Sequence, residues 1–256
     1  MSTRFLILIP LLLLACSSTK EKPVPFSGQI AQAHGEEDLY RQPGVAGRLD
    51  VMFDGQKVIA GELFFEPSTG RARIDLDEGG RLVFDGERAW SVGTGQAVYP
   101  MTRFHLLTWP YFFSAPWKLS DPGTLMSPID ERPLQGERLP SARMTFVTGT
   151  GDTPDDWYVV FADPETNALR ALAYIVTYGQ PLERANEEPH VATYEEYAQV
   201  GGLMVPSSIR FWNWNENAGV QGAPIGKATF ADIEFRSARE GFFDVPESAV
   251  EDVLPQ

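Results

Sequence analysis

Cysteine and histidine are scarce in this sequence. Its 256 residues include one Cys and three His, which are His34, His105 and His190. A disulfide framework needs paired cysteines, and a zinc finger needs four Cys or His ligands at close spacing, so both classes are excluded. The three histidines are also too far apart along the chain to form a local metal-binding pair.

Positive charge is scarce as well. The chain has 21 Lys and Arg against 35 Asp and Glu, which gives a net charge of −14 at pH 7. Nucleic-acid binding needs a clustered basic surface that displaces counterions from phosphates, so this class is excluded. Docking on anionic lipid through charge is disfavoured for the same reason. Because 43% of the residues are hydrophobic, the chain can still bury a sizeable core.

The N-terminus carries a short apolar run that ends at the single cysteine. The apolar stretch Phe5–Leu14 follows Arg4 and is shorter than the roughly 20 residues of a transmembrane helix. The sequence Leu-Leu-Ala-Cys at 13–16 resembles the bacterial lipobox, whose Cys is acylated. We therefore expect 1–15 to be a lipoprotein signal peptide and Cys16 to be the site of lipid attachment. The alternative is an ordinary cleaved signal peptide with an incidental Cys.

Acylation of Cys16 would tether the protein to a membrane. Each buried CH₂ contributes about 0.8 kcal/mol, so two or more acyl chains make a stable anchor. Ser17 follows the Cys, and in Gram-negative lipoproteins a residue other than Asp there generally implies delivery to the outer membrane. We expect an outer-membrane anchor that faces the periplasm, with the polar, Pro-containing segment 16–28 as a flexible tether.

The rest of the chain, 29–256, is predicted to form one mainly β domain. A helix is expected at 29–41, with Ser27 as its N-cap and Gly35 dividing it. From Val45 apolar and polar residues alternate, which indicates strands separated by turns at eight-to-twelve-residue spacing, as in a sandwich or barrel. Strands are expected at 45–53, 58–65 and 71–76, at three short stretches set off by the turns 78–80, 85–86 and 93–95, and at 142–148, 157–163, 169–177, 191–200, 203–214 and 226–235, with 241–246 closing the chain.

The segment Met101–Leu119 interrupts the strand pattern. It is apolar on every helical face and contains Pro110 and Pro116. A helix that is apolar all round is buried in protein or in membrane. The prolines and the charged residues Arg103 and Lys118 argue against a membrane span. We expect one or two short helical turns lying on or inside the sheet.

Motifs for catalysis are weak. There is no Gly-x-Ser-x-Gly elbow, and the phosphate-loop likeness at 222–227 lacks the first Gly and the hydroxyl residue. The Gly-Thr-Gly sequence at 93–95 lacks the third Gly of a dinucleotide site. His105 is expected to be a packed residue with one hydrogen bond, and His34 a helix-end residue. A hydrolase that uses His105 or His190 stays open as a minor alternative.

Two acidic stretches resemble calcium loops. In Asp75–Gly80 the fifth position is Gly79, which offers no side-chain oxygen ligand, so a hairpin turn is the better interpretation. The loop 151–156 offers three carboxylates between Asp152 and Asp156. These residues fit either a calcium site or the capping of a strand end.

Aromatic residues are plentiful, with 16 Phe, 8 Tyr and 6 Trp. Many occupy alternate strand positions, such as Phe211 on one face and Trp212 and Trp214 on the other. They predict either a filled core or an apolar concavity that the segment 101–119 fills only in part. The second interpretation leaves room for an acyl chain.

The order of these features resembles the Lol-type lipoprotein carrier superfamily, including its outer membrane lipoprotein-sorting relatives. An N-terminal helix precedes a meander, and a Pro-interrupted apolar segment lies between two groups of strands. The closing pattern also agrees, in Tyr197–Val200, Gly201-Gly202-Leu203, Pro206, Ile209, Phe230, Ile233, Phe242-Phe243 and Val245-Pro246.

The resemblance implies a single open antiparallel half-barrel whose apolar concave face is covered by short helices and receives acyl chains. The chain has additional segments at 118–140 and 178–190, and a lipidated Cys16 would suit a receptor or sensor better than a shuttle. We expect a non-enzymatic protein that binds a lipid or lipoprotein acyl group, with no cofactor and no metal. The residues expected to contact the ligand are Phe104, Leu107, Trp109, Phe112, Phe113 and Trp117.

The main alternative is a periplasmic protein-binding sensor or assembly factor whose core is filled. The sequence does not specify its protein partner. The two hypotheses differ in whether the concave face holds an apolar cavity.

Overall fold

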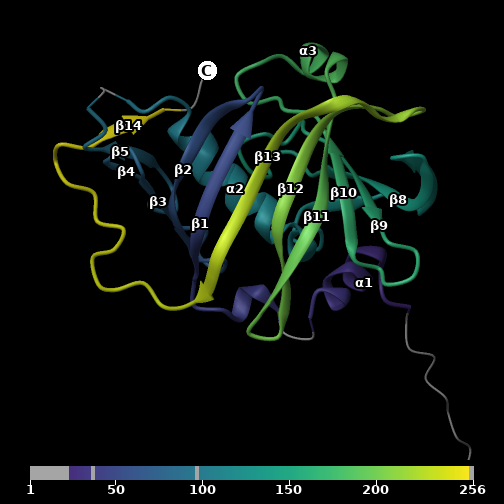
Figure 1. Ribbon diagram of the computed structural model, residues 1–256, viewed down its shortest axis with the longest axis horizontal. Coiled ribbons are helices and arrows are strands. Elements are labelled where there is room, and N and C mark those ends of the chain that lie inside the picture. Colours follow the sequence, from purple (N-terminus) through teal and green to yellow (C-terminus); the bar gives the residue numbers. More distant parts are fainter. Residues whose placement is uncertain (1–22, 36–37, 96–97, 254–256) are drawn as a thin grey trace, which may run out of the picture.

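The computed structural model describes residues 23–35, 38–95 and 98–253 (Figure 1). The predicted signal peptide, Cys16 and most of the tether lie outside the described residues. The helices are α1 (Phe26–Ala33), α2 (Thr102–Lys118), α3 (Leu182–Glu187) and the 3₁₀ helix η1 (Leu39–Arg41). The strands are β1 (Val45–Phe53), β2 (Gln56–Phe65), β3 (Ala72–Leu76), β4 (Arg81–Phe84), β5 (Ala89–Val92), β6 (Thr124–Met126), β7 (Asp130–Leu134), β8 (Glu137–Phe146), β9 (Tyr158–Ala162), β10 (Leu169–Tyr174), β11 (His190–Val200), β12 (Leu203–Asn215), β13 (Gly219–Phe235) and β14 (Val250–Asp252).

The described strands form one antiparallel sheet of fourteen strands. Its order is β14-β5-β4-β3-β2-β1-β13-β12-β11-β10-β9-β8-β6, with β7 paired to β8 beside β6. The sheet curls around α2, which contacts β3, β4 and β5 on one side and β12 on the other (Figure 1). The end strands β14 and β6 do not pair with each other, so the sheet stays open. The predicted open antiparallel half-barrel is confirmed.

Alternation of apolar and polar residues sets which face of each strand is buried. In β1, Leu49 and Val51 are fully buried in the concave core, while Asp50 and Met52 are not. Phe211 also lies in the concave core, whereas Trp214 packs in a second core on the outer face, under α3 and β7. The predicted opposite orientation of these two rings is confirmed.

The N-terminal helix differs from the prediction at 29–41. It begins at Phe26, whose ring is buried, so the last three residues of the segment 16–28 are helical. Ser27 therefore lies inside the first turn and forms no cap, and the N-cap position is Pro25. The helix ends at Ala33 with His34 as its C-cap, and Gly35 follows with a φ of 134° that L side chains rarely adopt. Phe26 is the first core residue in the described part of the chain, so a chain that starts at Ser17 retains every core residue that the structure describes.

The short turns expected at 101–119 are wrong, because α2 is a continuous helix of 17 residues that includes Pro110 and Pro116. A proline inside a helix cannot donate to the carbonyl four residues earlier. For Pro116 that carbonyl belongs to Phe112, and the buried Tyr194 hydroxyl donates to it at 2.9 Å. The tertiary contact supplies the hydrogen bond that the proline removes.

Tyr194→Phe should therefore destabilise the protein. The substitution removes the donor to the Phe112 carbonyl, and an unsatisfied buried acceptor costs about 1–3 kcal/mol of unfolding free energy. Urea unfolding followed by circular dichroism measures the loss. Tyr178→Phe is the control, because the Tyr178 hydroxyl forms no side-chain hydrogen bond in the described part of the chain. Equal stability of the two variants would contradict the role of Tyr194.

Several edge elements were not predicted. Of the three short strands expected after the turn at 78–80, β4 and β5 form, and residues 98–100 form no strand. The segment 118–140 supplies β6 and β7, the polar stretch 178–190 contains α3, and β14 pairs with β5. The closing segment 241–246 is not a strand. Within the described residues, no helix has the length and apolar content needed to cross a membrane.

Candidate ligand-binding cavity

Helix α2 has a buried face and a partly buried face. Phe113, Ala115 and Trp117 are buried in the concave core and do not line the cavity described below. The partly buried side chains recur at spacings of three and four residues, so they share the other face of the helix. They are Arg103, Phe104, Leu107, Thr108, Pro110, Tyr111 and Lys118.

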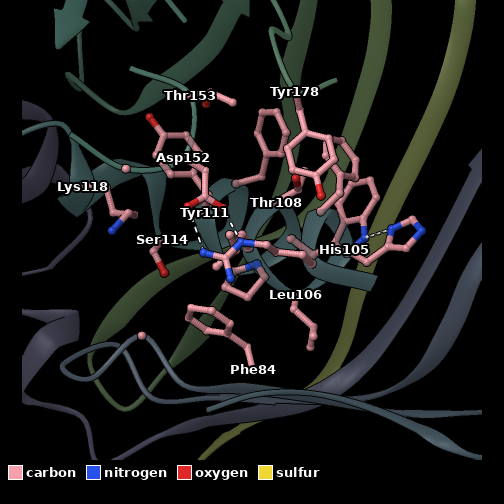
Figure 2. A pocket seen from close by; sticks show the side chains of 18 of the residues that line it. Phe84, His105, Leu106, Thr108, Tyr111, Ser114, Lys118, Asp152, Thr153 and Tyr178 are labelled. Carbon is pink, nitrogen blue, oxygen red and sulfur yellow. Dashed lines mark hydrogen bonds and ion pairs between the residues drawn. The ribbon is translucent and has the colours of Figure 1, made fainter. Parts of the chain in front are cut away.

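A cavity of about 1030 Å³ lies along α2 (Figure 2). The partly buried face contributes to its wall, and so do buried side chains of the same helix, which are His105, Leu106, Trp109, Phe112 and Ser114. Its far wall includes rings on the concave face of the sheet, from Tyr158, Tyr174 and Phe211. Sites for small molecules usually have volumes of about 300–1,000 Å³ and mostly apolar walls. The cavity is large enough for a ligand the size of a lipid chain.

The predicted contact residues divide between the cavity and the core. Phe104, Leu107, Trp109 and Phe112 line the cavity. Phe113 and Trp117 do not line it, because their positions on α2 turn them toward the sheet. Their part of the prediction therefore has no geometric support, and the ligand contacts of the other four stay a prediction.

Phe113 packs among the rings of the concave core. Its ring centroid lies 5.5 Å from that of Phe65 and 5.2 Å from that of Phe230, and the side chain is 1% exposed. Trp117 lies against the ring of His34, at 5.8 Å. Phe113 therefore packs α2 against the sheet, and Trp117 packs it against the C-terminal end of α1.

Cavity residues that the sequence did not single out include Tyr111 and Ser114 on α2 and Tyr158 and Tyr174 on β9 and β10. Tyr111 and Ser114 follow Phe104 and Leu107 along one helical face, so the helical period could have identified them. Nothing in the sequence indicates which strand positions face that side of the helix.

Arg103, the second residue of α2, lines the cavity at the N-terminal end of this helix. Its Nε donates to Asp152 Oδ2 at 2.6 Å and its Nη2 to Asp152 Oδ1 at 2.9 Å. Nη1 donates to the Glu87 carbonyl oxygen in the β4–β5 turn, and the Arg103 backbone N–H donates to Asp252 of β14. These bonds tie the loop between β8 and β9 to the opposite end of the open sheet.

Lys118 marks the other end of the cavity face of α2. Its Nζ lies 2.8 Å from Asp121 Oδ2, and the Tyr40 hydroxyl donates to Asp121 Oδ1 at 2.5 Å. Each end of this helical face therefore carries a cation with a carboxylate partner. The side chains between the two ends are mostly apolar.

His105 is buried beside the cavity, as a packed residue with one hydrogen bond. The Trp109 indole donates to its Nδ1 at 3.1 Å, which places the proton of the neutral ring on Nε2 (Figure 2). Burial lowers the pKa of His105 to about 4, so the ring is neutral at pH 7. No hydrogen bond joins His105 or His190 to a carboxylate within the described residues. The hydrolase alternative thus lacks an oriented acid–base pair.

The acidic loop 151–156 is held by protein contacts. Asp152 pairs with Arg103, whereas Asp156 accepts from the Thr177 N–H and hydroxyl and from the Thr153 hydroxyl. Burial raises the pKa of Asp156. Nowhere in the described residues do three or more metal-binding side chains gather. These contacts favour the strand-capping interpretation of this loop over a calcium site. The other acidic stretch forms the turn between β3 and β4.

His34 ends α1 and joins it to two strands. Its fully buried ring accepts from the Leu169 N–H at Nε2, at 3.0 Å, so Nδ1 donates to the Met204 carbonyl at 2.7 Å. The prediction of a helix-end residue is confirmed. Burial lowers the pKa of His34 from 6.5 to about 4, because a charged ring would lose its solvation.

The stability of the fold should consequently fall in mild acid. Unfolded His34 takes up a proton near pH 6.5 while folded His34 stays neutral until about pH 4. The stabilisation from the neutral ring is complete above pH 6.5 and is lost between these two values, by roughly 3 kcal/mol. Urea unfolding at a series of pH values measures this slope. His34→Gln keeps a donor and an acceptor without a titrating group, so an unchanged slope in this variant would contradict the assignment.

Comparison with known proteins supports the fold assignment. No family model and no curated protein matches the sequence. Among solved structures, the LolA superfamily protein NE2245 from Nitrosomonas europaea superposes with a TM-score of 0.54 over 86% of this chain and 96% of its own, at 9% identity. The fold is of the Lol type. At this identity the likeness concerns the fold alone.

Two further structures have lower scores. An outer membrane lipoprotein-sorting protein domain from Vibrio parahaemolyticus has a TM-score of 0.49 and 9% identity, and covers 85% of this chain and 94% of its own. A DUF1329 family protein from Desulfovibrio piger has a TM-score of 0.45 and 8% identity, with 86% and 94% covered. The Lol-type assignment rests on the first structure and on the open sheet.

Proposed function

We propose that this chain is a non-enzymatic lipoprotein of the bacterial cell envelope that binds an acyl chain of a lipid or lipoprotein. The observation that carries the proposal is the cavity of about 1030 Å³ between α2 and the concave face of the open sheet. The Lol-type fold supports it, because that fold is expected to receive acyl chains on this face. The binding step is burial of the chain against Phe104, Leu107 and the rings of β9, β10 and β12.

Acyl binding needs few polar contacts. At about 0.8 kcal/mol per CH₂, a sixteen-carbon chain contributes on the order of 12 kcal/mol before the entropic costs of binding. The surplus left after those costs can still give a specific complex. The side chains between the ion pairs of Arg103 and Lys118 are mostly apolar, which suits a hydrocarbon chain.

The proposed anchor places the cavity close to a membrane. Cys16 lies outside the described residues, so its acylation rests on the lipobox resemblance. The stretch 17–25 joins Cys16 to the buried Phe26, and the distance between these two residues is at most about 35 Å when the stretch is extended. A protein held at this distance from the outer membrane, on its periplasmic side, would receive lipid at the bilayer surface.

Cys16→Ala should abolish membrane anchoring by lipid. The variant lacks the thiol that is acylated, so metabolic labelling with tritiated palmitate should fall to background. The wild-type chain should be labelled and should leave the membrane fraction only with detergent. Ser17→Ala is the control and should be labelled like the wild type. Labelling that persists in the Cys16 variant would contradict the anchor.

Native mass spectrometry of the chain that starts at Ser17 tests the binding function. After expression in a bacterial host we expect a bound species heavier than the protein by the mass of a lipid, and its removal by delipidation. An empty protein that takes up no added lipid would contradict the proposal. Co-purification of a specific protein partner by such an empty chain would favour the sensor or assembly-factor alternative.

A further inference from the structure

Charges around the cavity are unevenly distributed. The lining contains two cationic side chains, Arg103 and Lys118, and His105 is neutral at pH 7. The same lining contains five carboxylates, which are Glu66, Glu78, Asp121, Asp152 and Asp156. The walls therefore carry an excess of negative charge.

The lining cations are both neutralised by carboxylates. Arg103 pairs with Asp152 at 2.6 Å, and Lys118 pairs with Asp121 at 2.8 Å. Among the described residues of the lining, no cation is left over for a ligand.

Two of the three remaining carboxylates carry the excess charge, because the third, Glu66, has a cationic partner. Glu66 forms an ion pair at 2.7 Å with Arg71, a residue that does not line the cavity. Glu78 and Asp156 have no cationic partner within 4.0 Å in the described part of the chain. A negatively charged group in the cavity would meet these carboxylates without a free cation.

This distribution disfavours an anionic ligand. Taking a carboxylate out of water is costly unless a cation or several hydrogen bonds compensate it, and like charges in a region of low dielectric constant repel strongly. A free fatty acid carries such a carboxylate at the end of its chain. An ester or amide of the same chain carries only a carbonyl acceptor.

Donors for such a carbonyl are present on the cavity face of α2. Thr108 and Ser114 both line the cavity (Figure 2). Neither hydroxyl forms a side-chain hydrogen bond within the residues that the structure describes. An uncharged carbonyl can therefore be bound without disrupting either ion pair.

We propose that the cavity selects acyl chains in an uncharged ester or amide linkage over free fatty acids. This inference rests on the proposed function, because it specifies the chemistry of the ligand for the same cavity. The apolar wall binds the chain. The ion pairs Arg103–Asp152 and Lys118–Asp121 leave no free cation for a carboxylate, which selects against negatively charged ligands.

Binding of 1-palmitoylglycerol and palmitate to the chain that starts at Ser17 tests the selectivity. Both carry the same chain, and at pH 8 only palmitate is charged. Displacement of the uncharged dye N-phenyl-1-naphthylamine measures both affinities below micelle-forming concentrations. We expect the glycerol ester to bind about tenfold more tightly than palmitate, or better.

Asp121→Asn probes the cause of the selectivity. The amide keeps an oxygen acceptor for Tyr40 but leaves Lys118 without a carboxylate, so palmitate should bind about tenfold more tightly than to the wild type. Asp75→Asn makes the same change of charge outside the cavity, where Asp75 pairs with Arg73 at 2.7 Å. This control should leave the ratio of the two affinities unchanged.

The outcomes separate the inference from the proposed function. Palmitate binding as tightly as the ester, or a ratio unchanged by Asp121→Asn, would overturn the selectivity while leaving acyl binding intact. Failure of the dye and of both ligands to bind would overturn the proposed function, and the selectivity with it.

Discussion

Leu107→Glu is expected to lower the affinity for an acyl chain by about tenfold or more. Leu107 lines the cavity and lies about one helical turn after Arg103, between the two ion pairs formed by Arg103 and Lys118. A carboxylate there would have to lose its hydration for a chain to pack over it. Because Leu107 is only partly buried, the substitution should cost little folding stability. Titration of the lipid-free protein with 1-palmitoylglycerol measures the effect.

Leu125→Glu provides the control for this prediction. Leu125 is a 53% exposed leucine on the edge strand β6 and does not line the cavity. The same change of size and charge at this position should leave acyl affinity within about twofold of the wild type. Equal losses of acyl affinity in the two variants would show that an added negative charge weakens binding wherever it lies on the protein. An undiminished affinity in Leu107→Glu would place the ligand elsewhere.

Phe113→Ala is expected to lower the free energy of unfolding by about 3–5 kcal/mol. The ring is 1% exposed, lies between Phe65 and Phe230, and leaves a void when it is removed. Thermal and urea unfolding measure the loss. At temperatures where the variant stays folded, its affinity for an acyl chain should change less than that of Leu107→Glu, because Phe113 does not line the cavity.

Phe104→Ala, compared with Phe113→Ala, tests whether α2 has a cavity face distinct from its core face. Phe104 is only partly buried and lines the cavity, so its removal should cost about 1 kcal/mol of stability. Acyl affinity should fall in the same variant because apolar contact area is lost. If the two phenylalanine variants lost stability equally, the division of α2 into a core face and a cavity face would be wrong.

The regular part of the fold was predictable because strand periodicity is a local signal. Residues 45–53 alternate so regularly that the prediction agrees with β1 at both ends. Short edge strands such as β6, β7 and β14 have three to five residues, which is too few to show a clear alternation of apolar and polar positions. Their pairing depends on neighbours distant in the sequence, such as Ser91 opposite Val250, which no local pattern indicates.

Helix α2 shows the limit of local rules more clearly. Pro110 and Pro116 predict interruptions because each removes a hydrogen bond inside the helix. The chain continues as a helix through both residues, with Tyr194 donating to the carbonyl that Pro116 leaves free. That donor comes from β11, and only the folded structure brings it near the helix.

The sequence predicted that the segment 101–119 forms the candidate site, but not which of its residues line the cavity. A helix with apolar residues on all sides gives no indication of which side meets a cavity, so core residues and cavity residues were predicted together. Arg103 and Lys118 are the informative exceptions, because they lie on one face at its two ends. Their carboxylate partners, Asp152 and Asp121, come from a loop and a turn whose positions depend on the whole sheet.

Photo-cross-linking tests the central claim most directly, namely that the cavity beside α2 holds an acyl chain. A palmitoylglycerol that carries a diazirine in the middle of its chain would be bound to the lipid-free protein, irradiated and mapped by peptide mass spectrometry. The account predicts cross-links to the cavity residues of α2, around Leu107 and Tyr111, and to the facing strands β9 and β10, all suppressed by excess unlabelled ester. Cross-links confined to the outer face of the sheet, or not suppressed by the ester, would contradict it.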